Sequence, residues 1–340
     1  MKPFCHRLSA PALIASGLVL SVMGATAHSE APAADQKPLP VALVDAMNAL
    51  AGGPHQGYRA NHAKGILVEG TFTPAKSAPG LSKAPHFAKS VPIMVRFSDT
   101  TGVPNLPDAA PEASPHGMAI RFKLPDGSST DIVCISANSF PVATPEDFLA
   151  FLTAAASSGS GVPKPTPVEQ FLGGHPAALK FVTTPRPAPD SFGTLSFYGV
   201  NAFKFTNAQG VSRYTRYQVI PEAGDRALTP DQTAKAKANY LMDELPQRLA
   251  KGPVKFRLQV QLAKEGDSTN DGTQVWPDDR ETVILGVITL KTVTPDQVAA
   301  QRTLIMFNPL NLPPGIEPST DPVLLARPAA YGVSYGQRIQ

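Results

Sequence analysis

Apolar and polar residues alternate in several short segments of the chain, with the period of two that is typical of half-buried β-strands. The most regular segment is 254–262, in which every second residue is apolar, and 282–290 is apolar enough for a central strand. Six further segments complete a set of eight predicted strands: 66–72, 93–98, 117–124, 131–136, 201–205 and 212–219. A tight turn at 125–127 joins two of them as a hairpin.

Other segments have the spacing of helices. Apolar residues recur at helical intervals from Val41 to Leu50, and Pro145 follows the capping residue Thr144 at the start of a helix over 145–156. Short helical pieces are expected at 168–172 and 177–182. A long helix is expected from Thr229 to about Leu245, and a last helix over 322–338.

These elements predict an α+β protein. Thirty-six prolines and 26 glycines exclude a helix bundle, and 42% apolar residues are enough for a sizeable core. The two groups of four antiparallel strands would most simply close into an eight-stranded β-barrel, because closure removes exposed strand edges. Helices are inserted in and arranged around this barrel. We expect residues 38–340 to form a single domain.

The first 27 residues have the features of a signal peptide. Lys2 and Arg7 precede an apolar stretch, and Ala25-Thr26-Ala27 fits a small-x-small cleavage site. Residues 28–37 are predicted to be a flexible lead-in. We therefore expect an exported, periplasmic protein with no membrane span after cleavage.

Charge and cysteine content narrow the possible partners. Cleavage would remove Lys2 and Arg7 and lower the formal charge from +3 to +1, which argues against nucleic acid as a partner. It would also remove Cys5, leaving Cys134 as the only cysteine, so no internal disulfide is possible. Cys134 lies in an apolar strand and is predicted to be a small buried hydrophobic residue.

A polar segment at 57–65 carries the first candidate chemistry. Arg59 stands three residues before His62, and Gly65 allows a tight turn into the first strand. A histidine at a strand end can accept and return a proton near neutral pH, and a neighbouring arginine can hold an anion. Taken alone, the pair also fits a surface histidine beside a solvated arginine.

The predicted last helix carries the second candidate. Arg327 and Tyr331 stand at positions i and i+4 on one face, with Arg338 two turns further on. A nearby positive charge favours the phenolate form, and a phenolate can be an axial ligand of haem iron. On these residues alone, a tyrosine packed in the core with its hydroxyl bonded to a neighbour is the other interpretation.

Five motifs together resemble those of the haem catalases, in the order in which that family carries them. They are His62 in R-x-x-H-A-K-G, Arg96-Phe97-Ser98, Asn138 after Asp131-Ile132-Val133, the loop 307–319, and R-x-x-x-Y at Arg327 and Tyr331. Matching stretches run from about Tyr58 to Arg338. The resemblance implies a haem cofactor, of the b type, and a peroxide substrate.

The resemblance also implies roles for individual residues. His62 would be the distal acid–base group, Asn138 the amide that orients peroxide, and Ser98 the hydroxyl that orients His62. Tyr331 would be the ligand of the iron, with Arg327 keeping it ionised. The residues implied to pair with the haem propionates are Arg59, Arg96 and Arg338. The other histidines, His55, His86, His116 and His175, match no motif and are assigned to loops, and Trp276 is assigned to packing.

The sequence departs from the family pattern at several positions. Asn61 stands where catalases usually have an apolar residue, Asn201 where many have histidine, and Tyr335 where large catalases tend to have histidine. The chain stops two residues after Arg338, so the C-terminal helical domain of ordinary catalases is expected to be absent. It is therefore most similar to the compact exported catalase-related peroxidases, and we expect a monomer or dimer.

The leading functional hypothesis is a haem peroxidase that reduces H2O2 and organic hydroperoxides with a small external electron donor, and that has weak catalase activity. A true small catalase and a fatty-acid hydroperoxide isomerase remain open, and the isomerase would need no donor. A periplasmic haem-binding protein without enzymatic activity is the hypothesis from another class. The set of His62, Ser98 and Asn138 favours an enzyme, because a carrier has no use for it.

Overall fold

The computed structural model describes residues 37–297 and 305–340, and residues 37–340 form one compact unit. The predicted signal peptide at 1–27 and all but the last residue of the predicted lead-in at 28–37 lie outside the described residues.

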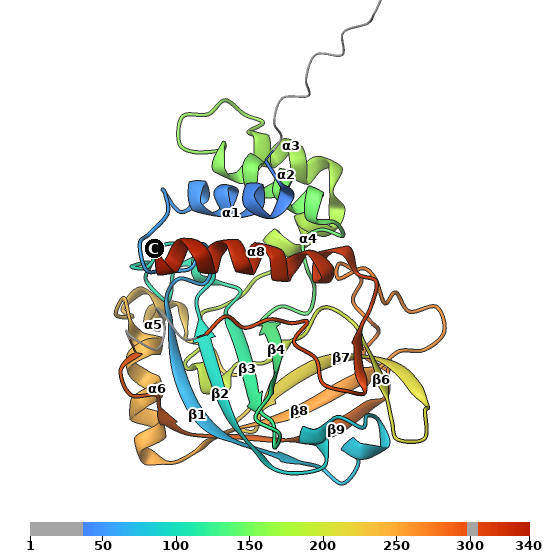
Figure 1. Cartoon of the computed structure of the whole chain (residues 1–340). Coiled ribbons are helices and arrows are strands. Elements are labelled where there is room, and N and C mark those ends of the chain that lie inside the picture. The colour runs from blue at the N-terminus through green and yellow to red at the C-terminus, as the bar shows by residue number, and fades with distance from the viewer. Residues whose placement is uncertain (1–36, 298–304) are drawn as a thin grey trace, which may run out of the picture. The chain divides into compact units, whose positions relative to one another are not determined.

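A ten-stranded antiparallel sheet forms the body of this unit (Figure 1). Its strands are β1 (Gly65–Pro74), β2 (Val91–Ser98), β3 (Gly117–Lys123), β4 (Ser129–Ile135), β5 (Phe197–Tyr198), β6 (Phe203–Thr206), β7 (Ser212–Pro221), β8 (Val254–Leu262), β9 (Thr282–Val293) and β10 (Ile316–Pro318). Eight of them form a closed ring in the order β7-β5-β4-β3-β2-β1-β9-β8, because β8 pairs back onto β7. The predicted eight-stranded barrel is confirmed.

The closure of the ring differs in detail from the prediction. The predicted strand at 201–205 corresponds to β6, which extends the sheet from β7 and pairs with β10 outside the ring. The two-residue β5 instead links β4 to β7, through Tyr198 opposite Ile135 and Gln218. A strand of two residues is too short to show a period in the sequence, so it was not predicted.

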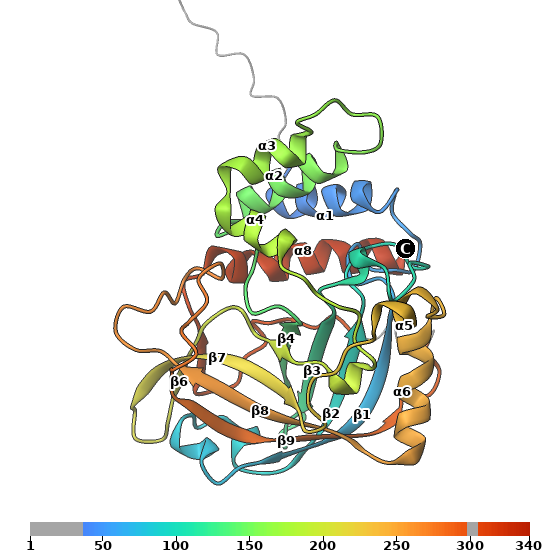
Figure 2. The same ribbon diagram turned by 180° about the vertical axis from the view of Figure 1, so that it is seen from behind.

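Most of the helices lie together on one side of the barrel, whereas α5 (Pro230–Ala234) and α6 (Tyr240–Lys251) lie along its flank (Figures 1 and 2). The helices on that one side are α1 (Leu39–Leu50), α2 (Pro145–Ala156), α3 (Pro167–Gly174), α4 (Pro176–Thr183) and α8 (Pro322–Ile339), and the 3-10 turns of the chain are η1 (Ala78–Gly80), η2 (Pro85–Phe87), η3 (Pro111–Ala113) and η4 (Phe192–Thr194). Figures 1 and 2 show α8 running between the barrel and the layer formed by α1, α2 and α3. α8 therefore has the barrel on one side and α1 on the other.

The predicted long helix from Thr229 to Leu245 is wrong. α5 ends at Ala234, and α6 begins at Tyr240. Contacts from distant residues hold the break: the Asp108 carboxylate accepts the Leu241 N–H, and the Lys64 ammonium donates to the carbonyl of Ala238. Local propensity cannot predict such a break, because its cause lies more than 100 residues away.

Successive residues of each strand point alternately into the barrel core and towards the outer face of the sheet, here called the second face. Val95 and Phe97 of β2 belong to the main core cluster, as do Met118 and Ile120 of β3. The residues between them point the other way, towards the helices. This second face is where the candidate site lies.

His86 is a correction to the assignment of the unmatched histidines to loops. It lies in η2, is 1% exposed, and is surrounded by aromatic rings, including Phe122 at 4.8 Å and Phe87 at 4.1 Å between ring centroids. Burial lowers the pKa of His86 to about 3. The side chain is therefore neutral in the folded protein at ordinary pH.

We expect this histidine to make the fold sensitive to acid. Between pH 6.5 and about 3, the unfolded chain takes up a proton at His86 that the folded chain does not, so stability falls as the pH falls. His86→Leu should make the decrease shallower by up to about 1.4 kcal/mol per pH unit in that window. Urea unfolding at several pH values measures the slope, and equal slopes for the two proteins would contradict the prediction.

Candidate active site

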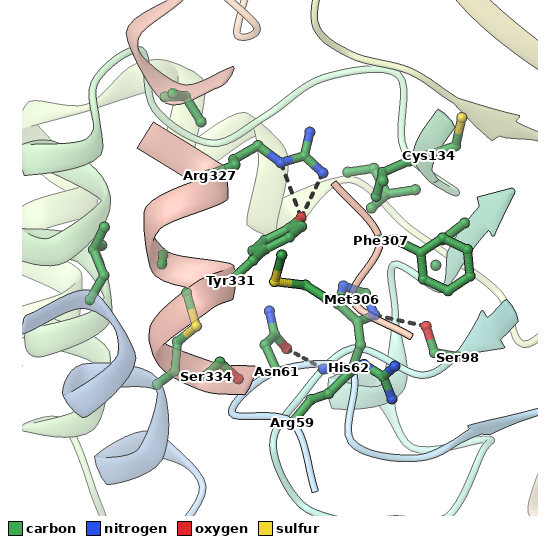
Figure 3. Close-up of a pocket in the computed structure, with 18 of the residues that line it drawn as sticks. Arg59, Asn61, His62, Ser98, Cys134, Met306, Phe307, Arg327, Tyr331 and Ser334 are labelled. Atoms are coloured by element: carbon green, nitrogen blue, oxygen red, sulfur yellow. Dashed lines mark hydrogen bonds between the residues drawn. The ribbon is translucent and has the colours of Figure 1, made fainter. Parts of the chain in front are cut away.

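A cavity lies between the second face of the barrel and α8, and it collects residues from both ends of the chain (Figure 3). One wall is a row across three paired strands, in which Ser98 of β2 stands opposite Gly117 of β3, and Gly117 opposite Ile135 of β4. α8 supplies Tyr331 on the other side. Of the predicted site residues, the structure brings His62, Ser98, Arg59, Arg96, Arg327, Arg338 and Tyr331 together here.

His62 is held at the cavity by its backbone and by its ring. Its φ of 56° is in the left-handed region, which is uncommon for a residue other than glycine. The ring Nδ1 lies 3.0 Å from the Ser98 hydroxyl, as predicted from the sequence. This bond occupies one ring nitrogen and leaves Nε2 to face other groups.

Gly117 allows this placement of His62. A Cβ at residue 117 would lie 2.7 Å from the Ser98 hydroxyl oxygen and 2.9 Å from the His62 ring. Both distances are below any normal contact, so only glycine lets the imidazole pack flat against β3. In the sequence, Gly117 was recognisable only as the start of a predicted strand, because its contact with His62 joins residues far apart in the chain.

The surroundings of His62 disfavour its charged form. Its pKa is lowered to about 3, first by burial and then by the positive charges of Arg96, Arg327 and Arg59. His62 is half-buried as a residue and lines the cavity. At neutral pH the imidazole is therefore uncharged and can accept a proton.

Three arginines converge on one end of the cavity. Arg59 and Arg338 each donate to the carbonyl of Ile305, at 2.9 and 3.2 Å, and Arg96 donates to that of Ala63. Burial and the neighbouring guanidinium groups lower the pKa of Arg59 well below its usual value and that of Arg96 to about 9. Neither Arg59 nor Arg338 forms an ion pair with a described residue, and the buried Nε of Arg338 has no hydrogen-bond partner there.

On the opposite side, Arg327 holds the phenol of Tyr331. Its Nε and Nη2 both donate to the phenol oxygen, at 3.1 and 2.8 Å. Its Nη1 donates to the amide oxygen of Asn201 at 2.8 Å, and the Asn201 amide nitrogen donates to Asp321, the N-cap of α8. The contact between Arg327 and Tyr331 agrees with their i and i+4 spacing, and the two donors fix the position of the phenol oxygen.

The structure does not bring Asn138 to the cavity with the other predicted site residues. Asn138 lies in the bend after β4 and does not line the cavity, whereas Ile135, the last residue of β4, does. Ile135 is in register with Gly117 and Ser98, and its side chain therefore faces the same way. Asn138 was predicted because it is an amide shortly after Asp131. The sequence alone did not show that the strand ends at Ile135.

Other residues fill positions that were not predicted. Asn61 lines the cavity next to His62, and its amide oxygen accepts the backbone N–H groups of His62 and Thr101. Leu43 and Met47 of α1 supply an apolar wall. Cys134 also reaches the lining, and burial raises the pKa of its thiol to about 12, in agreement with the predicted small hydrophobic residue.

The donor set fits the haem expected from the sequence. An apolar cavity with the phenol oxygen of Tyr331 on one side and a neutral imidazole on the other suits a flat iron porphyrin. Three guanidinium groups at one end, including the unpartnered Nε of Arg338, suit its two carboxylates. Among the described residues no cluster of His, Cys, Asp and Glu could bind a metal ion directly, and no described helix is long and apolar enough to cross a membrane.

Replacing the glycine that admits His62 should disturb the site and spare the fold. Gly117→Ala should push the imidazole off β3 and lengthen the bond between Ser98 and Nδ1, because the new methyl group would occupy the same space. Gly80→Ala is the matched control, since a Cβ there meets nothing within 4 Å. A crystal structure of Gly117→Ala with His62 in place would contradict this account.

Comparison with known proteins gives one consistent result. The family model described as catalase matches residues 57–339. The chain is 37% identical to a catalase-related peroxidase of Mycolicibacterium paratuberculosis, over 87% of this chain and 93% of that protein. It is 35% identical to a catalase-related peroxidase of Synechococcus elongatus, over 84% of this chain and 85% of that protein.

Larger catalases match over part of their length. Mouse catalase is 30% identical, over 83% of this chain and 56% of that protein. The fold resembles the crystal structure of a fungal catalase, with a TM-score of 0.72 at 24% identity, over 83% of this chain and 59% of that one. It also resembles catalase A from Saccharomyces cerevisiae, with a TM-score of 0.73 at 21% identity. The chain belongs to the catalase family.

Proposed function

We propose that this protein is a haem peroxidase that reduces organic hydroperoxides and H2O2 at the expense of a small external donor. The observation that carries the proposal is the pairing of two groups across one cavity. On one side is an uncharged His62 fixed by Ser98, and on the other is Tyr331 held by two N–H groups of Arg327. The names of two relatives that match over most of their length, both catalase-related peroxidases, support it.

The proposed reaction is ROOH + 2 AH → ROH + H2O + 2 A•, in which the peroxide is reduced and two donor molecules are each oxidised by one electron. Bound haem would supply the iron that carries out the redox chemistry. Tyr331 would bind the iron, and Arg59, Arg96 and Arg338 would hold the propionates. The chain's own part in bond cleavage is proton movement by His62.

His62 has the geometry for that proton movement. With Nδ1 held by Ser98, its Nε2 is the nitrogen that can accept the hydroperoxide proton and return it to the leaving oxygen. The pKa near 3 keeps the ring neutral and ready to accept. Carboxylates bound at the nearby arginines would offset the positive charge that depresses this pKa, so binding of such an anion would strengthen His62 as a base.

The cavity wall favours organic hydroperoxides over the release of oxygen from H2O2. Ile135, Phe140 and Phe148 present apolar surface that can contact an alkyl group. Oxygen release requires a second H2O2 to be held and oriented as the reductant. Ile135, which is in register with Gly117 and Ser98 on the cavity wall, offers such a molecule no hydrogen bond.

The ligand role of Tyr331 has a direct test. Tyr331→Phe should lose most of its haem while keeping the fold, because the phenol oxygen that Arg327 prepares for the iron is removed. Tyr335→Phe is the control, one turn further along the same cavity-lining helix face. Haem content per chain and the optical spectrum are the measurements. Full occupancy with an unchanged spectrum in Tyr331→Phe would assign the ligand elsewhere.

The ratio of peroxidase turnover to oxygen evolution tests the proposed function. Steady-state turnover of an alkyl hydroperoxide with a dye donor should exceed oxygen evolution from H2O2, and it should stop when the donor is left out. His62→Ala should lower both rates by a similar factor, roughly 10² to 10⁴, because both pass through the same proton transfer. Dominant oxygen evolution would indicate a true small catalase. Turnover without a donor would indicate an isomerase.

A further inference from the structure

We propose that the side-chain amide of Asn61 donates a hydrogen bond to the peroxide while His62 acts on its proton. This inference rests on the proposed function and assigns the distal amide role that Asn138 cannot fill. Asn61 precedes His62 directly, so a single loop would carry both groups (Figure 3).

The orientation of the amide is fixed by the protein. Its oxygen accepts two backbone N–H groups, from His62 at 2.9 Å and from Thr101 at 2.8 Å. A flipped amide would place its NH2 group against these two donors, so the flip is excluded. The Nδ2 group therefore points away from the backbone.

The Nδ2 group faces the cavity with its hydrogens available. Asn61 is one of the lining residues, and its nitrogen donates to no acceptor within the described residues 37–297 and 305–340. Figure 3 shows this nitrogen turned from the His62 backbone towards the side of Tyr331. A donor held in this way costs little further ordering when a ligand arrives.

Two amides of the described chain line the cavity, Asn61 and Asn201. The second lining amide, Asn201, uses its oxygen for Arg327 and its nitrogen for Asp321. The Ser98 hydroxyl is bonded to His62, and the Ser334 hydroxyl oxygen accepts the Ala60 N–H. Asn61 is therefore the lining amide, within the described chain, that can still donate.

A hydroperoxide is complementary to the pair formed by Asn61 and His62. Its O–H can donate to the uncharged Nε2 of His62, while its oxygen lone pairs can accept from Nδ2 of Asn61. The same anchoring bonds hold His62 in its left-handed conformation, with φ 56°, so the distance between the two groups is set by the backbone. Asn61 would thus both bind the peroxide and position the base.

Two variants separate donation from simple anchoring. Asn61→Asp keeps an oxygen for the two backbone N–H groups and removes the NH2 donor, whereas Asn61→Leu removes both. Asn138→Ala is the control, because Asn138 does not line the cavity. The probe is cyanide binding to the haem-loaded ferric protein, followed by optical titration, with haem content and urea unfolding recorded for each variant.

We expect the Kd for cyanide to rise about tenfold in both Asn61 variants, the size of one hydrogen bond to a bound ligand, and to stay unchanged in Asn138→Ala. The loss in uncharged Asn61→Leu excludes charge repulsion as the common cause. A wild-type Kd in either Asn61 variant overturns the inference, and in Asn61→Asp it leaves anchoring as the role. A wild-type chain that takes up no haem would instead overturn the proposed function.

Discussion

The concentration of positive charge around one apolar cavity is the constraint on which this structure depends. Arg59, Arg96, Arg327 and Arg338 all line the cavity, and no aspartate or glutamate of the described chain does. Burial lowers the pKa of Arg59, Arg96 and Arg338, and repulsion from neighbouring guanidinium groups lowers it further at Arg59 and Arg96. Buried charge without a partner is costly, so a bound anion should stabilise the folded chain as well as complete the site. The same positive field depresses the pKa of His62, which couples the strength of the base to the anion that the arginines hold.

Much of the fold followed from period and turn residues. The alternation at 254–262 matches β8, and the capped start at Pro145 matches α2, because in both cases the determining interactions are local. The errors lie where distant residues decide the outcome. Asp108 and Lys64 bind the backbone where the helix predicted after Thr229 is interrupted. The two-residue strand β5 pairs with β7 and so closes the barrel. Neither feature produces a periodic pattern of apolar residues from which it could be predicted.

The candidate site shows the same division. Arg327 and Tyr331 could be predicted as partners because helix geometry fixes their relation, and the bond between Ser98 and His62 followed from the family resemblance. The distal amide could not be placed in this way. Whether Asn138 or Ile135 faces the cavity depends on the residue at which β4 ends, and a shift of that end changes the face presented. Asn61 was visible as a departure from the family pattern, but its available donor follows only from the two N–H groups that occupy its oxygen.

The two sides of the cavity differ in what they can do with a proton. On the side of α8, the hydrogen bonds run from Tyr331 through Arg327 and Asn201 to the N-cap Asp321. An amide in the middle of that chain has no titratable proton to pass on, so the connection can orient the phenol of Tyr331 without relaying protons. On the opposite side His62 can titrate, and its ring is tied to a serine rather than to a carboxylate. Proton transfer would therefore be the task of the His62 side, whereas the hydrogen bonds on the side of α8 keep the Tyr331 side chain in place.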